Sequence, residues 1–94
     1  MKEKSEILQQ FGRNIRELRE SRGLSQEEFA ATVGLDRTYI GGIERGERNT
    51  GLLNVYRIAQ GLKVAPAKLL SHLGEIAPDS SEKNLKSKTD EERR

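Results

Sequence analysis

The chain has 94 residues, of which 33% are apolar and 34% are charged, and its formal net charge is +2 at pH 7. This length allows one small domain, and the lack of cysteine excludes disulfides and thiolate metal sites. No apolar run approaches the ~20 residues of a transmembrane helix, and the first residues lack the apolar core of a signal peptide, so we expect a cytoplasmic protein.

The first predicted helix covers residues 5–22. Its apolar residues recur at steps of three and four with charged residues between them, as on a helix with one buried face: Leu8, Phe11, Ile15 and Leu18. Gly23 ends this helix, because glycine readily takes the left-handed conformation that follows many helices.

Two short helices are predicted next, over residues 26–33 and 37–45. Ser25, with Glu28 three positions later, forms a capping box at the start of the second helix. Gly34 provides a tight left-handed turn, and the third helix begins after a new cap. This arrangement is typical of a helix-turn-helix, whose second helix enters the major groove of DNA. The polar face that we expect to point outward from that helix consists of Arg37, Thr38, Tyr39 and Gly42.

Two further helices are predicted after a polar loop. Thr50 is the expected N-cap of the fourth helix, which carries apolar residues as far as Leu62. Pro66 suits the first turn of a fifth helix, which extends to Leu73.

Composition changes near the end of the chain. We predict a domain over residues 1–76 and a charged, disordered tail over residues 77–94, which contain a single large apolar residue. Residues 1–74 hold twelve Lys or Arg and nine Asp or Glu, whereas residues 75–94 hold five and six. The domain is therefore more basic than the whole chain, and a nearly neutral protein can bind DNA when its basic groups share one face.

Four stretches carry a family resemblance. Residues 24–34 and 39–46 combine the cap, the small residue, the turn glycine and the apolar edge, and they resemble the Xre/Cro family of phage-repressor-like DNA-binding domains. Residues 36–49 and 52–59 are similar to the controller proteins of restriction–modification systems. The resemblance implies an all-α, five-helix, lambda-repressor-like domain. Gly41 stands where controllers usually carry serine.

The resemblance implies that the first turn of the third helix meets base edges of DNA. Arg37 can bind guanine with two hydrogen bonds, and Thr38 can offer thymine a hydroxyl or a methyl group. Tyr39 has two alternatives: to reach a phosphate or base, or to pack its ring on the domain with the hydroxyl in water. Gly41 and Gly42 each destabilise a helix by about 1 kcal/mol relative to alanine. That cost favours the interpretation that the two glycines let the helix approach DNA closely. The alternative is that they arose by evolutionary drift on a helix that tertiary packing already holds.

Four residues are assigned to phosphate contacts: Gln26, Arg45, Arg48 and Asn49. The first assignment is implied by the resemblance, because the start of the second helix binds phosphate in that family. The other three residues follow the recognition helix, and we expect them along the DNA backbone or the minor groove. The resemblance also pairs Arg19 with Glu44, as a structural ion pair away from DNA.

Dimerisation is expected, because helix-turn-helix proteins usually read pseudopalindromic operators as two-fold dimers. The last two predicted helices carry more apolar surface than so small a core needs. Some of these apolar residues are needed inside the monomer. The candidates for the homodimer interface are Val64, Leu69, Leu70 and Leu73.

The predicted function is therefore sequence-specific regulation of transcription, with a restriction–modification controller as the favoured subgroup. A phage-type repressor, an antitoxin, and a protein-binding adaptor that does not read DNA stay open as alternatives. Operator DNA is the expected partner, and RNA polymerase is a further candidate partner of the tail. We predict no enzyme, cofactor, metal or small-molecule ligand, since the single histidine, His72, and its neighbour Ser71 point in different directions on a short helix.

Overall fold

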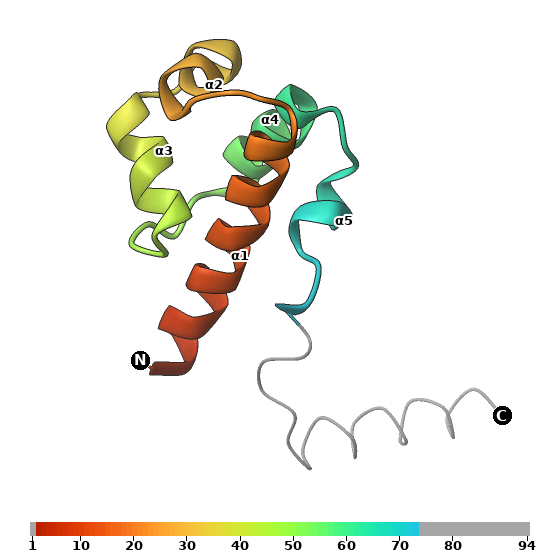
Figure 1. Ribbon diagram of the computed structural model, residues 1–94. Helices are drawn as coiled ribbons and strands as arrows, with labels where there is room; N and C mark the ends of the chain where they lie inside the picture. The colour runs from red at the N-terminus through yellow and green to blue at the C-terminus, as the bar shows by residue number, and fades with distance from the viewer. Residues whose placement is uncertain (1, 74–94) are drawn as a thin grey trace, which may run out of the picture.

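The computed structural model describes residues 2–73, with side chains described from residue 6 onward. Regular secondary structure in this range is all helical: α1 (Lys2–Ser21), α2 (Gln26–Val33), α3 (Arg37–Glu44), α4 (Leu52–Leu62) and α5 (Pro66–Leu69). The long helix α1 packs against α3 on one side and against α5 on the other, while α4 lies between α2 and α5 (Figure 1). The predicted all-α fold is confirmed; the predictions for the tail fall outside the described residues.

The two central helices begin as their sequences predict. The Ser25 hydroxyl accepts a hydrogen bond from the backbone N–H of Glu28 at 3.0 Å, and the Glu28 carboxylate accepts one from the Ser25 N–H at 2.9 Å. Gly34 takes the left-handed conformation with a φ of 73°. The carboxylate of Asp36 then accepts from the backbone N–H of Thr38 at 3.2 Å, which caps α3. These local bonds fix the turn between α2 and α3.

The predicted cap of the fourth helix is wrong. Helix α4 begins after Gly51, which makes no side-chain capping bond. Thr50 has another partner instead, because its hydroxyl accepts a hydrogen bond from the Tyr39 hydroxyl at 2.8 Å. A contact with α3 has therefore replaced the expected local cap.

The fifth helix is shorter than its apolar pattern predicts, ending at Leu69 instead of Leu73. Buried Asn14 on α1 explains the end, since its Nδ2 atom donates to the carbonyls of Leu69 and Ser71, both at 2.8 Å. These bonds hold the segment after α5 in a non-helical conformation, in which His72 takes a left-handed φ of 70°. The segment after α5 is thus anchored to α1.

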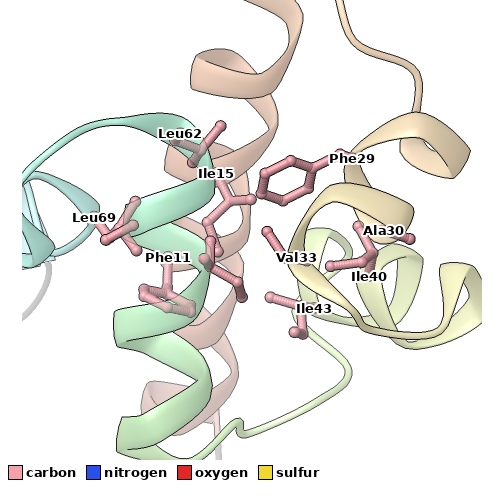
Figure 2. Packing of buried hydrophobic residues seen from close by; sticks show 11 residues of the cluster. Phe11, Ile15, Phe29, Ala30, Val33, Ile40, Ile43, Leu62 and Leu69 are labelled. Atoms are coloured by element: carbon pink, nitrogen blue, oxygen red, sulfur yellow. The ribbon is translucent and has the colours of Figure 1, made fainter.

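The core is aliphatic around two phenylalanines, as the composition predicts. Side chains from α1, α2, α3 and α4 meet in its centre, and α5 adds Leu69 (Figure 2). The buried apolar residues are Phe11, Ile15, Phe29, Ala30, Val33, Ile40, Ile43, Ile58, Ala59, Leu62 and Leu69. Burial of an aliphatic or aromatic side chain contributes about 1.5–3 kcal/mol, and this cluster holds α3 in place.

A backbone contact between α1 and α3 depends on Gly12. A Cβ atom at this position would meet the backbone carbonyls of Ile43 and Glu44 too closely. The glycine therefore allows α1 to pass directly against the end of α3. This close crossing brings the next turns of α1 beside the Glu44 side chain.

Candidate nucleic-acid interface

The first turn of α3 presents two exposed polar side chains, Arg37 and Thr38. The opposite side of the helix is fixed by Ile40 and Ile43, which are buried in the core. Within the described residues, neither the Arg37 guanidinium nor the Thr38 hydroxyl makes a hydrogen bond to another group. Their donors and acceptors are thus available to a ligand in front of α3.

Tyr39 packs inward, as in the second of its two predicted alternatives, but its hydroxyl is not left to water. The ring is half-buried against the core, and the hydroxyl donates to Thr50 at 2.8 Å. The guanidinium carbon of Arg48 lies over the ring, 5.6 Å from its centroid. Tyr39 therefore joins α3 to the loop that follows it.

Gly42 does not point outward as its sequence position predicts, because it is buried under another side chain. A Cβ atom on Gly42 would lie 2.8 Å from Cγ of Arg48. Gly41 is buried as well, and a Cβ atom there would lie 3.1 Å from Nη1 of Arg45 and 3.5 Å from Oε1 of Gln26. In this structure, the side chains of Gln26 on α2 and of Arg45 and Arg48, which follow α3, cover the two glycines.

Gln26 belongs to a network around a buried carboxylate. Its Nε2 atom donates to Glu44 Oε1 at 2.9 Å. The predicted ion pair of Arg19 with Glu44 is confirmed, with Arg19 Nε 2.7 Å from Glu44 Oε2 and Arg19 Nη2 3.0 Å from Glu44 Oε1. Both charged residues are 7% exposed. The hydrogen bonds to Glu44 raise the pKa of Arg19, so the guanidinium keeps its charge although it is buried.

The two arginines after α3 have different surroundings. Arg45 donates to both carboxylate oxygens of Glu47, at 3.0 and 3.1 Å, and the pair is exposed. Those hydrogen bonds raise the pKa of Arg45 and lower that of Glu47. Arg48 has no such carboxylate partner within the described residues. Asn49 is exposed and lies beside a shallow hollow that Ile7 and Leu70 help to line.

The predicted dimer residues are not equally accessible. Leu69 is 0% exposed and belongs to the core, so it is one of the candidates that the monomer itself buries, and it is not available to an interface. Val64 and Leu73 pack partly against the core, while Leu70 is exposed.

The largest exposed apolar side chains lie on α4 and were missing from the prediction. Leu52 and Leu53 are 80% and 81% exposed, and Tyr56 is exposed one turn later. Helix α4 carries two adjacent leucines in addition to its buried residues Ile58 and Leu62, which is more apolar surface than one buried face accommodates. This excess is the sequence signal that could have identified Leu52 and Leu53 as exposed.

A match to known proteins places this geometry in a family. Residues 15–69 match the family model HTH_3, described as helix-turn-helix. The chain belongs to this family. It is a helix-turn-helix transcriptional regulator of the Xre/Cro type, as the sequence resemblance implies.

Its relatives include controller proteins. The chain is 43% identical over 70 residues to control protein C.MunI from Mycoplasma sp, which covers 73% of this chain and 95% of the relative. It is similar to the crystal structure of the restriction–modification controller C.AhdI from Aeromonas hydrophila, with 50% identity, a TM-score of 0.65, and coverage of 66% and 94% of the two chains. These names describe regulators and not enzymes, in agreement with the expected absence of catalysis.

A third relative was solved with DNA. The tetramer of controller C.Esp1396I, in complex with its natural 35 base-pair operator, matches with 35% identity and a TM-score of 0.65 over 73% of this chain and 91% of that chain.

Across residues 2–73 of the present chain, no helix combines the length and the apolar character that crossing a membrane requires. The same residues contain no cluster of potential metal ligands.

Proposed function

We propose that this regulator binds a pseudopalindromic operator as a homodimer and acts as the controller of a restriction–modification system. The observation that carries the proposal is the exposed first turn of α3, where the side chains of Arg37 and Thr38 have no hydrogen-bonding partner among the described residues. Similarity to C.MunI and C.AhdI supports the controller subgroup, and the operator complex of C.Esp1396I supports the ligand.

In this proposal, the groups around α3 divide between bases and phosphates. Arg37 and Thr38 contact base edges, while Gln26, Arg45 and Arg48 contact the DNA backbone. The amide of Gln26 has two N–H donors, of which one binds Glu44 and the second is available to a phosphate oxygen. Arg45 exchanges Glu47 for phosphate at small cost, because exposed ion pairs are weak. Asn49 lies farther along the loop and has the weakest support among the predicted phosphate contacts.

The dimer interface that we propose differs from the set predicted from the sequence. It centres on three exposed apolar residues of α4, which are Leu52, Leu53 and Tyr56, and it extends to Leu70. Several large apolar side chains exposed on so small a domain are typical of an interaction surface.

Selection from random-sequence DNA tests this function. We expect the enriched fragments to contain two inverted half-sites whose centres lie about 10 base pairs apart, or one helical turn. A site without two-fold symmetry would contradict the homodimer, and an absence of enrichment would favour the protein-binding adaptor. To test the controller assignment, the selected site should occur upstream of the chain's own gene, and the neighbouring genes should encode an endonuclease and a methyltransferase.

A further inference from the structure

Arg48 comes from the loop after α3, yet its side chain folds back over that helix. It occupies the space that a side chain at position 42 would need. The three heavy atoms nearest to a Cβ placed on Gly42 all belong to Arg48: Cγ at 2.8 Å, Nε at 3.3 Å and Cδ at 3.7 Å. A carbon–carbon distance of 2.8 Å is shorter than non-bonded contact allows, since such atoms prefer about 3.5–4.0 Å. The observed conformation of Arg48 therefore requires glycine at position 42.

A second contact holds the far end of the same side chain. The Arg48 guanidinium lies 5.6 Å from the centre of the Tyr39 ring, within the range of a cation–π interaction. The ring is fixed in turn, because its hydroxyl donates to Thr50 at 2.8 Å and its body packs against the core. We call Gly42, Tyr39 and Thr50 together the arginine seat.

The seat orients Arg48 without a salt bridge, although the charge of Arg48 helps to lower the pKa of the neighbouring Glu47 carboxylate. No carboxylate or carbonyl in residues 6–73 accepts a hydrogen bond from its guanidinium, and the residue stays exposed. Arg45 provides the contrast, because Glu47 occupies its guanidinium on two nitrogens. Arg48 thus keeps its donors for an external acceptor, while its carbon chain and the central carbon of its guanidinium are already placed.

We infer that Gly42 is a positioning residue: it seats Arg48 across the DNA-facing side of α3 and so prepares a loop arginine for DNA before DNA arrives. The inference rests on the proposed function. Ordering a long side chain on binding is unfavourable, and a side chain already ordered avoids most of that loss. The expected benefit is about two- to tenfold in affinity. Gly42 then acts on DNA through Arg48 and not by its own contact.

The seat itself is tested in the free protein by NMR. The Tyr39 ring should shift the side-chain protons of Arg48 upfield in the wild-type chain. Gly42→Ala should abolish that shift, because the methyl group takes the space of Arg48 Cγ. Gly41→Ala is the matched control: it adds the same methyl group one residue away, where the nearest atoms belong to Arg45 and Gln26, and should leave the shift in place. Equal Arg48 shifts in wild type and Gly42→Ala would overturn the seat.

The role in binding is tested by a double-mutant cycle with a duplex selected from random DNA by the wild-type protein. Gly42→Ala should weaken binding about two- to tenfold when Arg48 is present and hardly at all in the Arg48→Ala background. Gly41→Ala should have an effect of the same size in both backgrounds. Thermal unfolding of every variant should show that the fold is retained, because alanine is favourable in a helix.

The outcomes separate this inference from the proposed function. If Gly42→Ala weakens binding equally with and without Arg48, the methyl group touches DNA itself and the positioning role is wrong. If Gly42→Ala tightens binding, seated Arg48 obstructs DNA, which also overturns it. If wild-type protein enriches no duplex although the NMR shift is present, the proposed function fails and the role in DNA binding fails with it, whereas the seat stands as a feature of the free protein.

Discussion

Arg19 and Glu44 form a two-pronged ion pair that joins α1 to the end of α3, with N–O distances of 2.7 and 3.0 Å. The same carboxylate accepts a hydrogen bond from Gln26, the first residue of α2. One buried group therefore connects three helices, and one of its partners lies at the proposed phosphate contact. Within the described residues, every buried side-chain N and O atom in this network is paired.

Arg19→Ala should destabilise the protein strongly, because it leaves the Glu44 carboxylate buried with its main partner removed. Loss of one partner of a buried pair costs about 3–5 kcal/mol, which is a large share of the stability of a domain this small. Thermal or urea unfolding followed by circular dichroism measures the change.

Arg16→Ala is the control for this prediction. Arg16 pairs with Glu20 on the same helix at 3.2 Å, but both side chains are more than half exposed. Such surface pairs contribute about 0–1 kcal/mol. Equal effects of Arg16→Ala and Arg19→Ala would show that the buried pair has no special role in the fold.

Arg37→Ala and Gln26→Ala should affect DNA binding in different ways. A base contact by Arg37 contributes about 1–3 kcal/mol to discrimination, so Arg37→Ala should weaken the selected site and relax the preference at one position in each half-site. Gln26→Ala should weaken selected and random DNA alike, since phosphate carries no base identity. Binding curves on both duplexes decide this. An equal loss of affinity for the two duplexes after Arg37→Ala would show that Arg37 does not recognise a base.

Leu53→Glu should shift the protein toward monomer. The wild-type leucine is 81% exposed on α4, and a buried charge in its place would oppose an apolar interface. Ala31→Glu adds the same charge at an exposed position of α2 and should leave the oligomeric state unchanged. Analytical ultracentrifugation over a range of concentrations provides the measurement. A dimer that persists in Leu53→Glu would place the interface elsewhere.

The sequence predicts those parts of this fold that depend on neighbouring residues. Ser25, Glu28 and Asp36 act as caps within their own turns, and Gly34 takes its left-handed conformation locally. For this reason the bounds of α2 and the start of α3 are predicted correctly. Apolar spacing likewise identifies the core face of α1.

Features that depend on distant residues were missed. Asn14, which is 55 positions away from Leu69 in the sequence, binds the backbone where α5 ends. Thr50, the predicted cap of α4, instead accepts a hydrogen bond from the Tyr39 hydroxyl. Leu69 and Leu70 are adjacent in an apolar run, and only the packing of α5 on its neighbours decides which one enters the core. Gly42 was predicted to face outward, because nothing in the neighbouring sequence indicates that Arg48 folds back over α3.

Glu47→Gln should strengthen binding to any DNA, because Glu47 competes with phosphate for Arg45. The hydrogen bonds from Arg45 lower the pKa of Glu47, so the pair is fully formed at neutral pH and is lost only as pH falls through that lowered pKa. The gain at pH 7 should stay below about fivefold, as expected for an exposed pair. It should shrink in acidic buffer, where wild-type Glu47 begins to take up a proton.

Salt dependence distinguishes a released Arg45 from a simple change of net charge. If Arg45 gains a phosphate contact in Glu47→Gln, the slope of log K against log salt should become steeper by about 0.9. Glu20→Gln removes the same charge from the exposed Arg16–Glu20 pair on α1, and there the slope should not change. Equal slopes for wild type, Glu47→Gln and Glu20→Gln would mean that Arg45 does not reach phosphate, and the DNA backbone contacts after α3 would then rest on Arg48.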